Sequence, residues 1–175
     1  MDTGAVFLDE SRRYLAREYA VKIRLCLTEL GDDDLWWRPN DQSNSIGNLL
    51  LHLAGNVRQW IVSGVGGAPD TRHRQAEFDE RGPMPRRELL RRFDAAVAEA
   101  DGVLRELDPR VLVESRRIQG RDTNVLKAVY HVVEHFGMHT GQIVYLTKLR
   151  TGRDLGFYRD AGGLATEDWR TRGGV

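Results

Sequence analysis

The sequence lacks the features that mark several classes of protein. It has one cysteine, Cys26, in 175 residues, which excludes an intramolecular disulfide and leaves no Cys-x-x-Cys pair for redox chemistry or zinc. No apolar run approaches the ~18 residues of a membrane-spanning helix, and the N-terminus has no apolar run of signal-peptide length. We therefore expect a soluble protein of the reducing cytoplasm, with no membrane as a partner.

The chain also lacks net charge and the short motifs of common enzymes. Its 26 basic and 26 acidic residues cancel, so no overall field favours nucleic acid as a partner. It contains no Gly-x-Ser-x-Gly or His-Glu-x-x-His motif, and Cys26 lies in the apolar phase of a helix, where a core residue is expected. The polypeptide alone therefore assigns no catalytic residue.

Four segments have the spacing of amphipathic helices, with glycines or prolines near their ends. The predicted helices cover about residues 5–30, 44–63, 85–107 and 123–150. The alternation in VLVESRRIQG predicts at most a short hairpin before the last helix, and residues 151–175 are predicted as an irregular tail. We predict an all-α fold in which residues 1–175 form a single domain.

Three of the five histidines stand four residues apart in the last predicted helix, at His131, His135 and His139. A helix rises about 1.5 Å per residue, so His131 and His139 lie about 12 Å apart along its axis and cannot share one ion. The pair His135 and His139, at i and i+4, points most directly toward the apolar face of this helix. His131 lies nearer the edge and is interpreted as an outer or surface residue.

A buried pair of imidazoles needs partners, because burying a polar group without a hydrogen bond or a metal costs a few kcal/mol. His52 is the candidate third ligand, since it belongs to a polar stripe on the otherwise apolar second helix. That stripe consists of Ser45, Asn48, His52, Asn56, Gln59 and Ser63. If the stripe faces the last helix, it lines a pocket around a metal; if it faces solvent, His52 is a surface residue. Both readings stay open here, and the loop residue His73 is not assigned.

Two stretches, SIGNLLLHLAGNVRQW and HVVEHFGMHTGQIVYLTKL, resemble the motif helices of the DinB/YfiT-like metalloprotein superfamily, and within it the DUF1572 group. The resemblance implies a four-helix bundle in up-down-down-up order, often dimeric. It also implies His52, His135 and His139 as the metal ligands, in agreement with the helical phase. Many relatives carry arginine after the last of these histidines, where this chain has Thr140.

The resemblance implies a chemistry as well. Three protein ligands leave open coordination positions, as in catalytic sites, and characterised members of the superfamily include thiol-dependent S-transferases and a mycothiol-dependent isomerase. We therefore expect a divalent metal ion that acts with a small-molecule thiol on an electrophilic substrate. Zinc and nickel are the leading candidates, although imidazole also suits iron and copper.

Four polar residues are the candidates to orient water or substrate around the ion: Asn48, Asn56, Gln59 and Gln142. Two other functions stay open beside the thiol S-transferase. One is a metal-dependent hydrolase, in which water replaces the thiol. The other is a non-enzymatic homodimer, which the metal stabilises by binding only the folded state.

Overall fold

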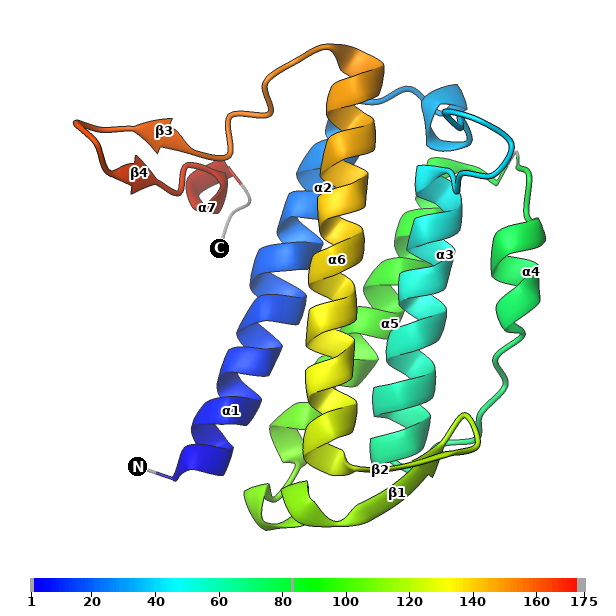
Figure 1. Ribbon diagram of the computed structural model, residues 1–175, viewed down its shortest axis with the longest axis vertical. Helices are drawn as coiled ribbons and strands as arrows, with labels where there is room; N and C mark the ends of the chain where they lie inside the picture. Colours follow the sequence, from blue (N-terminus) through cyan, green and yellow to red (C-terminus); the bar gives the residue numbers. More distant parts are fainter. Residues whose placement is uncertain (1, 83, 173–175) are drawn as a thin grey trace.

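The computed structural model describes residues 2–82 and 84–172, and it is mostly helical, as the sequence predicts (Figure 1). The first long segment runs without a break through α1 (Thr3–Arg12), the π-helical η1 (Arg13–Tyr19) and α2 (Ala20–Thr28). The second consists of α3 (Ile46–Val57) and the π-helical η3 (Arg58–Val65). The third is α5 (Arg86–Glu106) and the fourth is α6 (Val125–Thr151).

Shorter elements connect these segments. The 3-10 turn η2 (Asp33–Leu35) follows the first, the one-and-a-half-turn helix α4 (Arg74–Asp79) lies between η3 and α5, and the 3-10 turn η4 (Pro109–Val113) follows α5. Strands β1 (Ser115–Ile118) and β2 (Arg121–Asn124) precede α6. After α6 come β3 (Arg159–Asp160), β4 (Ala165–Thr166) and α7 (Trp169–Arg172).

The ends of the two site helices follow signals in the sequence. At the start of α3, Ser45 and Asn48 form a capping box, in which each side chain bonds the other residue's backbone N–H. At the start of α6, the side chain of Asn124 accepts a hydrogen bond from the N–H of Lys127. Gly152 ends α6 with a φ of 66°, the left-handed conformation that glycine adopts without strain.

The long segments pack around one shared apolar core. Helix α3 contacts α5 and α6, and the first segment also contacts α5 and α6. Phe93 of α5 and Phe136 of α6 are both fully buried, and their ring centroids lie 5.9 Å apart. Ile23 and Leu53 are fully buried as well. Burial of each such side chain contributes about 1.5–3 kcal/mol, which is why the apolar faces of these helices turn inward.

The hairpin expected before the last helix is present. β1 and β2 pair antiparallel, with Ser115 opposite Asn124 and Ile118 opposite Arg121. Gln119 and Gly120 form the turn with φ values of 54° and 72°, as a tight hairpin with two positive-φ residues requires. The side chain of Ile118 is buried against Gly64 of η3, so the hairpin closes one end of the bundle.

The tail after α6 contains regular structure, whereas the sequence predicts irregular chain there. β3 and β4 pair antiparallel and lie, with α7, on the α2 side of the bundle (Figure 1). The side chain of Trp169 in α7 is fully buried. The Nζ atom of Lys22 on α2 lies 4.7 Å from the centroid of the Trp169 ring. Elements of two to four residues are too short to show a periodicity in the sequence. The tail is therefore recognised as ordered only from the packing of Trp169 in the structure.

In the part of the chain that the structure describes, no helix combines the length and the apolar character that crossing a membrane requires.

Candidate metal centre

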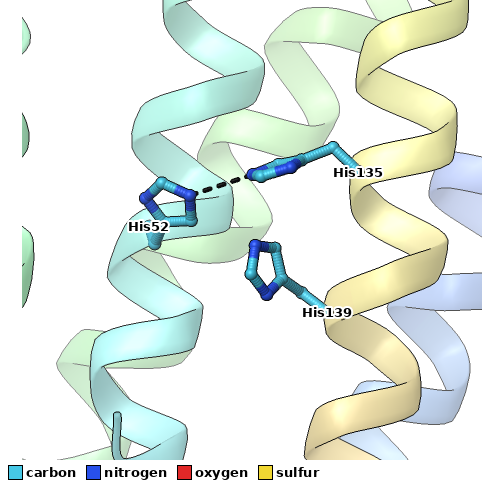
Figure 2. A group of neighbouring side chains, drawn as sticks. All are labelled: His52, His135 and His139. Atoms are coloured by element: carbon cyan, nitrogen blue, oxygen red, sulfur yellow. Dashed lines mark hydrogen bonds between the residues drawn. The ribbon is translucent and has the colours of Figure 1, made fainter. Parts of the chain in front are cut away.

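His52, His135 and His139 lie together between α3 and α6 (Figure 2). One ring nitrogen from each histidine lies within 4.8 Å of the others, and the Nε2 atoms of His52 and His135 are 2.9 Å apart. The side chains extend toward one another from the facing sides of the two helices. The three residues that sequence spacing and resemblance single out therefore form one cluster.

Helical phase explains how α6 supplies two of these side chains. His135 and His139 follow one another at i and i+4, so both project from the same face of the helix. Phe136 and Val132 lie beside them on this face and are fully buried. His139 is 8% exposed, His52 on α3 is 4% exposed, and His135 is half-buried. The cluster thus lies at the edge of the core.

The nitrogen atoms of the cluster fit a divalent metal ion. The Nε2 atom of His139 is buried and has no hydrogen-bond partner among the described residues. Imidazole nitrogens are ligands that divalent transition metals prefer, and a buried nitrogen without a partner is unfavourable. His52, His135 and His139 are the residues that would hold such an ion.

Hydrogen bonds at the far side of two rings support this arrangement. The Nδ1 atom of His139 lies 2.7 Å from Oε1 of Gln142, so the ring donates an N–H there and its Nε2 carries a lone pair. The Nδ1 atom of His52 lies 2.8 Å from Oε2 of Glu77. Metal-binding histidines commonly donate their second ring N–H to such an oxygen, which orients the ring.

Glu77 and Arg72 are two residues of this site that sequence reasoning missed. The Nε and Nη2 atoms of Arg72 bind the two oxygens of the Glu77 carboxylate at 2.7 and 2.8 Å. Burial raises the pKa of Glu77, but hydrogen bonds with Arg72 and His52 lower it more, so the pKa lies below its ordinary value. The sequence contains one sign of this contact, which is Gly55: glycine destabilises a helix interior, and Glu77 lies beside this position.

His135 and His139 are neutral at pH 7. The pKa of His135 falls to about 3, first because of burial and then because of the charges of its neighbours His139, His52, His131 and Arg72. Burial also lowers the pKa of His139, and the hydrogen bond with Gln142 opposes that effect in part. Neutral imidazoles offer the lone pairs that metal binding needs.

Asn48, a candidate pocket residue, supports the chain around the site. Its side chain is fully buried, and its Nδ2 donates to the backbone oxygens of Glu77 and Glu80 at 2.8 and 2.9 Å. Its Oδ1 accepts from the hydroxyl of Ser45 at 2.6 Å. Asn48 therefore fastens α4 to the start of α3.

The other candidate pocket residues lie in different settings. Asn56 is buried, and its Oδ1 has no hydrogen-bond partner among the described residues. Gln59 donates to Asp70 at 2.7 Å and accepts from Nη1 of Arg72 at 2.9 Å, so it belongs to the network around Glu77. Gln142 alone of the four bonds directly to a histidine of the cluster.

The two remaining histidines lie outside the cluster. The ring of His131 lies against Trp60, with centroids 4.3 Å apart, and stacks on His135 with centroids 5.4 Å apart. Burial lowers the pKa of His131. His73 is exposed at the start of α4. His131 is thus an outer neighbour of the cluster, as its helical phase predicts.

Two cavities flank the α3 helix. One of about 490 Å³ lies between α3, α5 and the segment that contains α4, and Gln59, Arg72 and Glu77 are among its lining residues. The other, of about 360 Å³, includes Gln142, the residue that bonds to Nδ1 of His139. Its lining consists of Pro39, Gln42, Ser43, Asn44, Leu49, Gln142, Tyr145 and Leu146.

Comparison with known proteins identifies the family. The family model described as "Protein of unknown function (DUF1572)" matches residues 2–157. Among solved structures, the chain is similar to the crystal structure of YjoA, a DinB-like protein from Bacillus subtilis, with a TM-score of 0.64 and 14% sequence identity. The match covers 87% of this chain and 99% of that one, and at this identity it shows the fold alone. No curated protein matches the chain. This chain, whose helical fold is DinB-like, therefore belongs to the DUF1572 family.

Proposed function

We propose that this chain holds one divalent metal ion between His52, His135 and His139 and acts as a thiol S-transferase with a small-molecule thiol. The buried Nε2 atom of His139, which has no partner among the described residues, carries the metal part of this proposal. An unpaired buried polar group costs about 1–3 kcal/mol, and coordination would remove that cost. Zinc and nickel are the proposed metals, and both accept imidazole ligands, as iron and copper also do.

The donor set favours an open, catalytic site over a closed, structural one. Three imidazoles from the chain leave room in the coordination shell for a ligand from solution. A divalent ion in such a site supplies Lewis acidity, which lowers the pKa of a coordinated thiol or water. The chain contributes neutral imidazoles in fixed orientations, with Gln142 holding the ring of His139 and Glu77 holding the ring of His52.

The reacting thiol comes from outside the chain in this proposal. The sulfur of Cys26 is fully buried in the core, and burial raises the pKa of its thiol to about 11. Such a thiol is almost entirely protonated at pH 7, and the protonated form is a poor nucleophile. The chain has no other cysteine, so thiol transfer requires a small-molecule thiol.

The electrophilic substrate is proposed to bind in the cavity that Gln142 lines. This cavity of about 360 Å³ is within the size range of small-molecule sites. None of its lining residues in the described part of the chain is charged, while Leu49, Leu146 and Tyr145 offer apolar surface. An uncharged, partly apolar electrophile fits this lining.

Elemental analysis of the purified protein tests the metal site. We expect about one zinc or nickel ion per chain in the wild type, and loss of the ion in His52→Ala and His139→Ala. His131→Ala is the matched control on the same helix and should keep the ion. A wild-type protein that binds neither metal after reconstitution would refute the site.

Activity assays then separate the three functions. The transferase predicts metal-dependent consumption of a low-molecular-weight thiol in the presence of an uncharged electrophile, with loss of activity in His139→Ala. A hydrolase would convert its substrate without any thiol. A non-enzymatic role is favoured if chelation lowers the melting temperature and neither reaction occurs.

We also propose the up-down-down-up helix order of the family and a homodimer. The order is supported by the colours of Figure 1, which progress upward along α1, α2 and α6 and downward along α3 and α5. The homodimer is supported by the outer face of α6, where Tyr130 and Tyr145 are 63% and 67% exposed.

The outer face of α6 has a symmetric pattern that suits a second copy of the chain. Leu126 and Leu149, and likewise Tyr130 and Tyr145, stand at equal distances from the peptide bond that follows Gly137. An antiparallel second α6 would therefore place leucine beside leucine and tyrosine beside tyrosine, as a two-fold symmetric interface requires.

Light scattering coupled to gel filtration tests this interface. We expect a dimer for the wild type and a monomer for Tyr145→Glu, because the substitution would bury two carboxylates. Leu164→Glu, at a site 75% exposed in the tail and away from α6, should stay dimeric. A wild-type monomer at micromolar concentration would contradict the homodimer.

A further inference from the structure

Glu77 is a buried carboxylate that reaches the metal centre from a segment outside the four long helices. It lies on α4, which runs beside α3 (Figure 1), and its side chain is 10% exposed. Buried carboxylates are rare unless they are paired, because removing a charge from water costs several kcal/mol. The position of Glu77 therefore needs an explanation.

Two side chains converge on the Glu77 carboxylate. Arg72, itself 4% exposed, binds both carboxylate oxygens in a bidentate ion pair. Nδ1 of His52 lies 2.8 Å from the Oε2 atom that Nη2 of Arg72 also contacts. A buried ion pair adds little net stability compared with apolar residues of the same size. We therefore attribute the Arg72–Glu77 pair to a role in orienting the ring of His52.

Nδ1 of His52 has two close neighbours: Oε2 of Glu77 at 2.8 Å, which can only accept, and Nη2 of Arg72 at 3.1 Å, which can only donate. Nη2 of Arg72 also bonds to the same Oε2 at 2.8 Å, so the shorter contact with the anionic oxygen favours one tautomer of His52. If Nδ1 carried a lone pair, that lone pair would face the carboxylate oxygen at 2.8 Å and repel it. With the proton on Nδ1, the ring donates to Oε2, and the lone pair is on Nε2, which faces His135. The Glu77 contact thus directs the metal-binding nitrogen of His52 toward the cluster.

The absence of a side chain at Gly55 lets Glu77 approach the backbone of α3. A Cβ atom at position 55 would lie 2.0 Å from Oε1 of Glu77 and 3.0 Å from Nε of Arg72, so only glycine leaves space for the pair. The backbone of α4 is held in addition, since Asn48 binds the carbonyl oxygens of Glu77 and Glu80. Glycine inside a helix costs about 1 kcal/mol relative to alanine, which the close approach of Glu77 explains.

We infer that Glu77 is a positioning residue, clamped by Arg72, that holds His52 as the Nδ1–H tautomer and so prepares its Nε2 for metal binding. The part of this inference that concerns affinity rests on the proposed metal site. The part that concerns the tautomer does not, because it is a property of the metal-free protein.

The first test measures the ring tautomers of the metal-free protein by long-range ¹H–¹⁵N NMR at pH 7. We expect the His52 ring of the wild type to carry its proton on Nδ1. A proton on Nε2 of His52 would overturn the inference, whether or not the protein binds a metal. Because this test uses the wild type alone, it does not depend on the folding of any variant.

The second test compares zinc affinity in competition with a chromogenic chelator. Glu77→Gln puts an NH2 group in place of one of the two carboxylate oxygens that Arg72 and His52 now share, and it removes the charge. It should weaken zinc binding about 10–100-fold, the usual effect of changing an outer partner of a metal-binding histidine. Glu99→Gln is the matched control: Glu99 lines the same cavity and pairs with Arg58, but it does not contact the cluster. Its zinc affinity should equal that of the wild type.

The outcomes separate the two proposals. Equal zinc affinities for Glu77→Gln and the wild type would overturn the inference and leave the metal site intact. Absence of zinc binding in the wild type would overturn the proposed function. The NMR measurement of the His52 tautomer would then be the test of whether Glu77 positions His52.

Discussion

The Nε2 atoms of His52 and His135 lie 2.9 Å apart, although 83 positions separate the two residues in the sequence. In the metal-free protein, two imidazole nitrogens at this distance need one proton between them. With His52 in the inferred Nδ1–H tautomer, the Nε2–H of His135 is the donor and the Nε2 of His52 accepts. Binding of a metal ion to both nitrogens would require this proton to move to Nδ1 of His135, so that the ring stays neutral and Nε2 offers its lone pair.

The low pKa of His135 predicts how the stability of the metal-free protein depends on pH. Its pKa is about 3 in the folded protein, compared with 6.5 for an ordinary histidine. Between these values the unfolded chain binds more protons at this residue, so stability is lost as the pH falls from 6.5 toward 3. The loss from one residue is at most about 1.4 kcal/mol per pH unit. Urea unfolding of His135→Gln should therefore show a smaller loss between pH 7 and 5 than the wild type, and an equal loss would contradict the prediction.

The hydrogen bond between His139 and Gln142 predicts an effect on metal affinity. Gln142→Leu removes the oxygen that accepts from Nδ1 of His139, so zinc binding should weaken about 10–100-fold. Gln142→Glu keeps an acceptor, adds a charge that makes the ring more basic, and should bind zinc at least as tightly as the wild type. Chelator competition measures both, with Gln75→Ala, an exposed residue of α4, as the control. Equal weakening by both Gln142 variants would show that the hydrogen bond is not the cause.

The close approach at Gly55 predicts a position-specific effect of alanine. In Gly55→Ala the new Cβ atom would lie 2.0 Å from Glu77, so the carboxylate or α3 must shift. We expect a loss of about 1–3 kcal/mol in the free energy of unfolding, together with weaker zinc binding. Gly102→Ala, inside α5 with open space around the site, should raise stability by up to about 1 kcal/mol. Equal stabilities for the two variants in urea unfolding would argue against the close contact.

The buried Trp169 predicts that the tail contributes to stability. Its side chain is fully buried beside Lys22, so Trp169→Ala should lower the free energy of unfolding by about 3–5 kcal/mol. Leu164→Ala, at an exposed position of the same tail, should change it by no more than about 0.5 kcal/mol. The metal content of both variants should match the wild type, since neither residue contacts the cluster. A stable Trp169→Ala protein would show that the tail is dispensable.

Much of the helical fold can be read from local patterns in the sequence. Helix α6 spans Val125–Thr151, close to the residues 123–150 that apolar spacing and the glycine after Thr151 predict. The relation between His135 and His139 is also local, because the helical repeat alone places i and i+4 on one face. Such features depend on residues a few positions apart, and the sequence displays those directly.

The sequence by itself determined the four long helices, the paired histidines of α6 and the polar stripe that contains His52. Only the tertiary structure decided that His52 of this stripe meets α6, whereas Asn48 and Gln59 bond to the segment that contains α4. It also decided that Glu77 and Arg72 complete the surroundings of His52. The physical reason is that α4 and the tail elements are too short to carry a periodic pattern. Their positions come from individual contacts, such as Glu77 over Gly55 and Trp169 beside Lys22, between residues far apart in the chain.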